Sequence, residues 1–357
     1  MNKIPTAREV NDPKPIAVIF GGRGKEREIS KRSGIAFIRQ MASLGYAVLP
    51  IFVDPEGRLL LYEGEPTEIS EDALSRLKVE AWPVYLSGKS GFLSAGDIIP
   101  VRCAAIIMHG DGGEDGSVQG ALETARIDYI GSGVGASAIS LDKYAAKCIA
   151  RELGIPVLDF RAYRLGDESP EQIKKRIEGD LGYPVFIKPR SLGSSIGASA
   201  AFSGEELISA LKAAKTVTDD IIAERCLADK RELEVAYYAL GDTVGATDPA
   251  EVDLGGGFYS FSEKYSQKSR ARLSVRADVS SEISARLREY TVRLSRVIGI
   301  RHFARLDYFL SGDNVYFSEV NTIPGMTEKS LFLSMLRDGG IGFAELASSL
   351  FGGYACE

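Results

Sequence analysis

The sequence predicts an α/β protein of more than one domain, with α+β character in its C-terminal part. The chain has 357 residues, which exceeds the roughly 100–200 residues of one ordinary domain. Short apolar runs of strand length alternate with helical patterns through the first part of the chain. Near the C-terminus two strand patterns follow each other directly, which is typical of an antiparallel hairpin.

The first segment predicts a strand, a glycine turn and a helix. Residues 16–20 form a compact apolar run that ends at two glycines, and residues 28–44 carry apolar side chains in a helical pattern. Strand-like runs at 47–53 and 104–108 alternate with helical stretches, so we expect a parallel sheet. Ligand sites on such sheets lie at the carboxyl ends of the strands. Two glycine-containing pairs fall there, Gly21-Gly22 and His109-Gly110.

The second segment predicts a helix at 143–153 and strands at 157–163 and 184–188. The stretch KPRSLGSSIG (188–197) follows the last of these strands and precedes a further strand at 198–202. This loop therefore connects two strands as a hairpin that carries serine and lysine. It differs from a P-loop, in which a strand leads through the loop into a helix.

Helix signals mark the rest of the chain. Ser203 and Glu206 match a capping box and predict the start of a helix at 207–215. Residues 231–240 predict a strand and residues 281–298 a helix. Four apolar residues at helical spacing mark a core face of that last helix, to which we assign no chemistry: Ile283, Leu287, Leu294 and Ile298.

Two strand patterns at 304–310 and 315–321 close the chain. Residues two apart in a strand point to the same side, so Arg305 shares a face with Asp307, and Glu319 with Asn321. An odd-length loop around 312–314 would set the two carboxylates opposite each other and the arginine opposite the asparagine, so that all four polar residues share one face. Carboxylate and amide oxygens suit Mg²⁺, and an arginine beside them suits a developing anionic oxygen.

Both candidate features have a structural alternative. The polar face also suits the solvated side of an edge hairpin, although the loop TIPGMT (322–327) fixes the chain just past the candidate ligands. Backbone N–H groups and hydroxyls of the 188–197 loop can cover a triphosphate, and Lys188 adds a positive charge. The same composition also suits a plain flexible hairpin.

Composition argues against several classes of protein. With 43 Lys+Arg against 49 Asp+Glu, the formal net charge is −6, so a basic nucleic-acid-binding surface is not dominant. The apolar runs fall short of the roughly 18–20 residues that cross a bilayer, and the polar start lacks the core of a signal peptide. The four cysteines form no CxxC pair, and only two histidines exist. We therefore expect a reducing cytoplasm and oxygen ligands for any metal.

Three tempting residues or motifs do not support a site. The stretch SGKS (87–90) has Pro83 where a Walker A motif requires glycine, and GGRG (21–24) lacks the GxGxxG pattern of dinucleotide-binding folds. His302 follows a helix and is interpreted as a structural or surface histidine.

Seven motifs in order resemble the D-alanine–D-alanine ligases of the ATP-grasp superfamily, over residues 16–350. They are GGRGKEREIS (21–30), HGDGGEDGSVQG (109–120), GSGVGASAISLDK (131–143), FIKPRSLGSSIG (186–197), FYSFSEKY (258–265), ARLDYF (304–309) and EVNTIPGMTEKSL (319–331).

The resemblance implies an ATP-grasp fold with three domains, at residues 1–131, 132–227 and 228–357, and ATP bound between the central and C-terminal domains. It implies that the γ-phosphate of ATP passes to the carboxylate of one D-alanine, and that the amine of a second attacks the D-alanyl phosphate to form D-alanyl-D-alanine for peptidoglycan. ATP is then a substrate, and two Mg²⁺ or Mn²⁺ ions assist. A cytoplasmic homodimer with no nucleic-acid or membrane partner is expected.

The resemblance also implies roles for residues on the nucleotide side. Arg305 matches the family's arginine at the acyl phosphate and oxyanion, and Lys264 matches a lysine on the loop that closes over the phosphates. The remaining matches are Asp307, Glu319 and Asn321 with the metal ligands, Lys143 and Lys188 with the phosphate-contacting lysines, Glu224 with the adenine region and Glu232 with the ribose contact.

On the amino-acid side, Glu26 matches the carboxylate that receives the ammonium of the first substrate. In the family it is linked to a serine and a tyrosine, which are Ser194 and Tyr265 here. His109 matches a residue that lines the substrate site. Ser330 and Leu331 match the pocket for the carboxylate of the second substrate.

The acceptor signals of this resemblance disagree. Tyr265 resembles ligases with an amine acceptor, and Glu263 beside it resembles the D-alanine–D-serine ligases, whereas Ser330-Leu331 resembles the D-alanine enzymes. We give Ser330-Leu331 more weight because the resemblance puts this pair at the acceptor. The alternatives are a D-alanine–D-serine ligase or another ATP-grasp dipeptide ligase of a specialised pathway and, from another class, a non-catalytic nucleotide-binding regulator.

Overall fold

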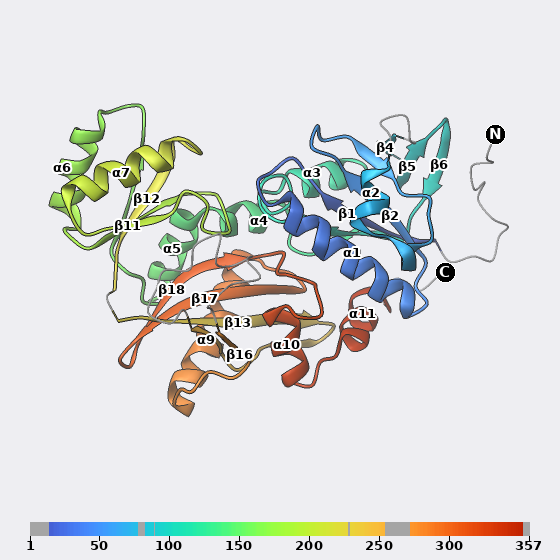
Figure 1. Cartoon of the computed structure of the whole chain (residues 1–357). Coiled ribbons are helices and arrows are strands. Elements are labelled where there is room, and N and C mark those ends of the chain that lie inside the picture. The colour runs from blue at the N-terminus through green and yellow to red at the C-terminus, as the bar shows by residue number, and fades with distance from the viewer. Residues whose placement is uncertain (1–13, 78–82, 89, 228, 254–271, 353–357) are drawn as a thin grey trace.

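The computed structural model describes residues 14–77, 83–88, 90–227, 229–253 and 272–352. Three larger β-sheets and one small one organise this part of the chain. The N-terminal part lies against the C-terminal part, while the middle of the chain forms a separate lobe that carries helices α6 and α7 (Figure 1).

The first sheet has the strand order β3-β2-β1-β7-β8. The neighbours β1/β2, β1/β7 and β7/β8 are parallel, which confirms the predicted parallel layer, and β3 is antiparallel on the edge. The strands are β1 (Ile16–Gly21), β2 (Val48–Val53), β3 (Leu59–Leu61), β7 (Cys103–Ile107) and β8 (Tyr129–Ile130).

Helix α1 (Arg27–Ser43) packs closely on β1, as the strand–glycine–helix pattern predicts. A Cβ atom at Gly34 would lie 2.4 Å from the Cβ of Phe20, so glycine is needed at this contact. Small elements complete the first part of the chain: η1 (Pro66–Glu68), α2 (Glu71–Ser75), the hairpin sheet β4 (Val84–Ser87), β5 (Gly91–Ser94) and β6 (Asp97–Pro100), and α3 (Ser117–Thr124).

The middle sheet is antiparallel, with the order β11-β10-β12-β9. Its strands are β9 (Phe160–Arg164), β10 (Val185–Pro189), β11 (Ser199–Ala201) and β12 (Asp220–Arg225); α6 (Pro170–Asp180) and α7 (Gly204–Lys215) share its core, and α4 (Val134–Leu141) and α5 (Lys143–Glu152) precede it. Strand β9 begins later than predicted, because Val157 instead forms an isolated bridge with Phe317.

The capping of α7 is only half of the predicted capping box. The hydroxyl of Ser203 accepts the N–H of Glu206, as expected. The carboxylate of Glu206 accepts the N–H of Phe202 instead of the N–H of Ser203.

The C-terminal sheet is built around β13, with the order β16-β15-β13-β17-β18 and β14 paired to β13. The four predicted core residues of α9 are buried against it, so their structural interpretation is confirmed. The elements are β13 (Arg231–Leu240), β14 (Thr243–Ala246), β15 (Ala250–Asp253), β16 (Arg272–Ser274), α9 (Ser281–Ile298), β17 (Phe303–Ser311), β18 (Asn314–Asn321), α10 (Leu331–Asp338) and α11 (Phe343–Phe351).

The closing hairpin of β17 and β18 has the predicted cross-strand pairing, but its turn is shorter than predicted and a β-bulge compensates for the difference. Asp307 lies opposite Glu319 and Arg305 opposite Asn321. The predicted odd-length loop is wrong, because Ser311 pairs with Asn314 across a two-residue turn. A β-bulge at Ser318 adds one residue to β18 and restores the pairing.

His302 is structural, since its Nδ1 accepts the N–H of Gly131 at 3.1 Å. None of the helices in the described part of the chain has the length and apolar character needed to cross a bilayer.

Candidate active site

Two cavities meet at the polar face of the closing hairpin. The first, cavity I, lies between the middle and C-terminal sheets. The second, cavity II, is lined by α1, by the loop after β7, by β13 and β17 of the C-terminal sheet and by residues 321–332. Asp307 lines cavity I, Arg305 and Asn321 line cavity II, and Glu234 and Glu319 line both.

Arg305 binds two carboxylates at this junction. Its Nε and Nη2 donate to Asp307 at 2.7 and 2.8 Å, and its Nε lies 3.3 Å from an oxygen of Glu234. Burial opposes the charge, but Asp307 and Glu234 outweigh that effect and raise the pKa of Arg305 well above its ordinary value. The guanidinium is therefore a fixed positive charge aimed at the junction of the two cavities.

The donor chemistry of the same face fits a hard divalent cation. Asp307 and Glu319 offer carboxylate oxygens and Asn321 an amide oxygen, all on one face. Asp307 is hydrogen-bonded by Arg305 and by the amide nitrogen of Asn321 (3.2 Å), and Glu319 lies 3.3 Å from Lys143 Nζ. Within the described ranges no group of three or more acidic, histidine or cysteine side chains is arranged around a metal position. Rotation of Asn321 would present its oxygen.

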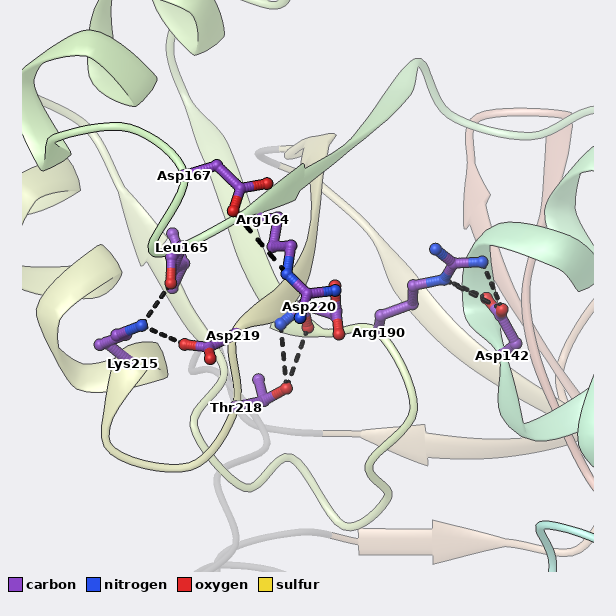
Figure 2. A network of polar contacts seen from close by, with 9 residues as sticks. All are labelled: Asp142, Arg164, Leu165, Asp167, Arg190, Lys215, Thr218, Asp219 and Asp220. Carbon is purple, nitrogen blue, oxygen red and sulfur yellow. Dashed lines mark hydrogen bonds and ion pairs between the residues drawn. The ribbon is translucent and has the colours of Figure 1, made fainter.

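Lys143 links helix α5 to the glycine/serine loop. Its Nζ donates to the carbonyl of Leu192 at 2.6 Å, within the loop. Asp142, directly before it, caps α5 and forms a bidentate pair with Arg190 at 2.6–2.9 Å, at the start of the loop (Figure 2). The start of α5, which carries the predicted phosphate-contacting lysine, is thus joined to the predicted phosphate-covering loop by two contacts, Lys143 with Leu192 and Asp142 with Arg190.

Lys188 and Glu224 line cavity I and form a buried cluster with a lysine that the sequence did not predict. Glu224 is paired with Lys188 and, at 3.0 Å, with Lys147, which also donates to the carbonyl of Phe317 at 3.1 Å. Burial raises the pKa of Glu224, but the two lysines outweigh it and lower the pKa to about 2. Lys147 lies one helical turn after Lys143, so both lysines lie on one face of α5. This four-residue spacing could have pointed to Lys147 from the sequence.

Glu232 lines cavity I beside this cluster. Its carboxylate lies 2.8 Å from Lys230 Nζ. The predicted ribose contact is therefore at the wall of the same cavity as Lys188 and Glu224.

Glu26 and Ser194 come together in cavity II, although they are 168 residues apart. The Ser194 hydroxyl donates to the carboxylate of Glu26. A Cβ atom at Gly193 would lie 2.8 Å from Glu26 Oε2, so the glycine lets the loop approach this carboxylate. The remaining predicted partner, Tyr265, lies outside the described residues, as does Lys264.

His109 lines cavity II next to α1. Its Nε2 is 3.1 Å from the hydroxyl of Ser33, and its backbone N–H donates to Ser30 at 2.8 Å. Burial, with the charge of Arg305, lowers the pKa of His109 to about 4, so the imidazole is neutral near pH 7.

Ser330 and Leu331 stand at the start of α10 and line cavity II. The Ser330 hydroxyl caps the helix by accepting the N–H of Leu333 at 3.4 Å. The N-terminus of a helix favours an anionic group, so this end of the cavity suits a carboxylate. Among the residues that the sequence did not point to, Lys230, Glu234 and Glu114 line the two cavities, and Lys147 pairs with Glu224.

Comparison with known proteins agrees with this arrangement. Residues 15–132 match the model for the D-ala D-ala ligase N-terminus, and residues 149–352 match the model for the C-terminus. The chain is 36% identical to a D-alanine–D-alanine ligase of Chlorobium phaeovibrioides, over 94% of this chain and 95% of the relative. It is 33% identical to that of Caldicellulosiruptor bescii, over 94% and 93%.

Solved structures give the same result. The VanG D-Ala:D-Ser ligase of Enterococcus faecalis superposes with a TM-score of 0.85 at 31% identity, covering 96% of this chain and 100% of the other. The D-alanyl-alanine synthetase A of Vibrio cholerae gives 0.83 at 28% identity, covering 96% and 99%. The expected ATP-grasp fold is confirmed. The chain belongs to the D-alanine–D-alanine ligase family.

Proposed function

We propose that the chain is an ATP-dependent ligase that joins two molecules of D-alanine into D-alanyl-D-alanine, a peptidoglycan precursor. One observation carries the proposal: the fixed positive charge of Arg305 stands where cavity I and cavity II meet. A phosphate entering from one cavity and a carboxylate entering from the other would meet at this guanidinium. Phosphoryl transfer depends mainly on such positioning and charge neutralisation.

The reaction follows from this placement. A carboxylate oxygen of the first D-alanine attacks the γ-phosphorus of ATP, and ADP leaves. The amine of the second D-alanine attacks the carbonyl of D-alanyl phosphate and loses a proton, and phosphate leaves the tetrahedral intermediate. Arg305 stabilises the negative charge on the acyl phosphate and on the oxyanion. Glu26 holds the first ammonium group, oriented by Ser194 and by Tyr265.

The nucleotide occupies cavity I. Lys143 and Lys188 contact the phosphates, and Lys264 closes over them. Glu224 lies at the adenine and Glu232 at the ribose. Asp307, Glu319 and Asn321 would hold two Mg²⁺ or Mn²⁺ ions, which neutralise phosphate charge when bound. The domains would be residues 1–131, 132–227 and 228–357.

The second D-alanine binds in cavity II beside His109. Its carboxylate meets the α10 N-terminus at Ser330 and Leu331. The enzyme would work in the cytoplasm as a homodimer. A D-serine acceptor is the nearest competitor, since a D-Ala:D-Ser ligase is among the similar structures.

The test is ATP- and Mg²⁺-dependent phosphate release with D-alanine alone, and then with added D-serine or D-lactate, with each product identified by mass. Efficient formation of D-alanyl-D-alanine from D-alanine alone supports the proposal. A requirement for another acceptor would keep the ligase class and overturn the substrate. Absence of turnover with every acceptor would favour a regulator.

A further inference from the structure

We propose that Glu114 is a positioning residue that fixes the two walls of cavity II against each other and thereby controls binding of the second amino acid. This inference rests on the proposed function. Glu114 is only 7% exposed. Its carboxylate bridges two segments that are far apart in the sequence: Oε2 accepts the N–H of Gly110 at 2.8 Å, and Oε1 accepts the N–H of Ile323 at 3.0 Å.

Ile323 is an anchor of the C-terminal wall. Its side chain is 4% exposed and belongs to the core of the first sheet, together with Met108 and Tyr129. Its backbone N–H is held by Glu114. The segment between Asn321 and Ser330 is thus attached to the first sheet at Ile323 by one apolar side chain and one hydrogen bond. It is also attached to α1 through Met326, a buried core residue whose carbonyl accepts Gln40 Nε2 at 3.2 Å.

The other wall is the turn after β7. Gly110 follows His109 directly, and the backbone N–H of Glu114 donates back to the carbonyl of Gly110 at 2.8 Å. His109 and Ser330 both line cavity II. Because each carboxylate oxygen of Glu114 serves one wall, movement of either wall breaks one of the two bonds.

A purely electrostatic role is the competing explanation, since Glu114 itself lines cavity II and interacts with the charges of Glu26 and Arg305. Two substitutions separate the explanations. Glu114→Asp keeps the charge but is one methylene shorter, so it cannot reach both N–H groups. Glu114→Gln keeps the length but turns an amide N–H₂ toward one of the two donors.

The experiment measures steady-state constants of the full-length enzyme for ATP and for the two D-alanine sites. We expect both Glu114 variants to raise the KM for the second D-alanine by about tenfold, because a broken bridge displaces the acceptor wall. The KM for ATP should change less than about twofold, because cavity I is not attached to the bridge. Glu114→Asp with wild-type constants would overturn the proposal in favour of a charge effect.

The matched control is Asp54→Asn. Asp54 is 4% exposed, and one of its oxygens accepts the N–H groups of Glu56 and Arg58 at 3.0 and 2.8 Å, within one turn. It lines neither cavity. This variant should leave all KM values within about twofold of wild type. If it raised the KM for the second D-alanine as much as Glu114→Gln does, the increase would be a general result of neutralising a buried carboxylate and would not point to the bridge.

Amide hydrogen exchange gives a readout that is independent of turnover. Exchange in peptides covering residues 109–113 and 322–327 should be faster in both Glu114 variants and unchanged in Asp54→Asn. Unchanged exchange in the Glu114 variants would overturn the positioning role. If the wild type forms no dipeptide, the proposed function fails, and the exchange data still decide whether Glu114 ties the walls together.

Discussion

At the scale of single residues, the site depends on how buried charges are compensated. Arg305 is held by Asp307 and Glu234, and Glu224 by Lys147 and Lys188. A buried ion keeps its charge only where partners offset its desolvation. These pairs raise the pKa of Arg305 and of Lys188 and therefore hold both groups charged and in place before any phosphate arrives.

Arg305 provides the first prediction at this scale. Arg305→Ala should retain ATP binding but lower kcat by roughly 100-fold or more, because the charge that stabilises the oxyanion is lost. Arg305→Lys, which keeps the charge without the two-pronged geometry, should recover part of that loss. Turnover and nucleotide affinity are measured on both variants, with thermal melts to exclude unfolding. Near-normal turnover of Arg305→Ala would refute its assigned role.

His109 and Glu114 predict opposite pH dependences of stability. Burial lowers the pKa of His109 to about 4 and, with the charge of Glu26, raises the pKa of Glu114 to about 7. Between about pH 4.5 and 6.5 the unfolded chain protonates His109 while the folded chain does not, so this group makes stability rise with pH. Over the same range the folded chain keeps a proton on Glu114 that the unfolded chain releases, so this group makes stability fall with pH.

Each of the two groups changes the free energy of unfolding by at most about 1.4 kcal/mol per pH unit, and in the wild type the two changes have opposite signs. Relative to wild type, His109→Gln should lose stability as pH rises through this range, and Glu114→Gln should gain it. Urea unfolding at several pH values gives the free energies. Parallel curves for the three proteins would contradict these ionisation states.

At the scale of elements, the glycine/serine loop is held at its start by the pair of Asp142 and Arg190, next to a second network around Arg164 and Asp220 (Figure 2). Arg190→Ala should raise the KM for ATP by about fivefold, on the order of 1 kcal/mol, because the loop and Lys143 lose a shared anchor. Asp142→Asn should do the same while preserving the helix cap.

Arg164→Ala is the control for this loop anchor, since Arg164 pairs with Asp167 and Asp220 on the same lobe, whereas Arg190 pairs with Asp142 at the start of α5. It should leave the KM for ATP unchanged. Equal effects of Arg190→Ala and Arg164→Ala would mean that the Asp142–Arg190 pair has no special role.

The bulge at Ser318 provides a second prediction for an element. Tyr308 pairs with Phe317 and Asp307 with Glu319, so deleting Ser318 would make Phe317 and Glu319 neighbours and keep Asp307 opposite Glu319 in a regular ladder. The deletion variant and Ser318→Ala should therefore both keep turnover within about tenfold of wild type, because each retains the cross-strand pairing of the polar face. Circular dichroism checks the fold of both. A folded deletion variant whose turnover falls by more than about 100-fold would show that the bulge itself, and not only the pairing, is required.

The hairpin also shows how far sequence reasoning reaches. Alternation along each strand predicted which residues share a face, because side-chain direction has a fixed period of two. The cross-strand pairing was right although the predicted loop was wrong, since a bulge compensated for the shorter turn. A bulge leaves no periodic signal, so the sequence alone could not predict it.

At the scale of the whole molecule, the sheets and most helices followed from local patterns. Strand alternation predicted the polar face of the closing hairpin, the glycine/serine loop pointed to Lys188, and the other site residues came from the resemblance to the ligase family. Lys147 and Glu114 did not, because their roles depend on contacts with Glu224 and Ile323, which lie far away in the chain. The separation between the walls of cavity II is likewise a tertiary property. Local sequence therefore predicted the components of the site and not the contacts that hold them together.

The central claim is that one carboxylate passes through an acyl phosphate between the two cavities, and isotope transfer tests it most directly. D-alanine labelled with ¹⁸O in its carboxylate is incubated with the enzyme, ATP and Mg²⁺, and the released phosphate is analysed by mass. The attacking carboxylate oxygen leaves with the phosphate, so we predict one ¹⁸O atom per phosphate for each D-alanyl-D-alanine formed. Dipeptide formation with unlabelled phosphate, or phosphate release without dipeptide, would contradict the account.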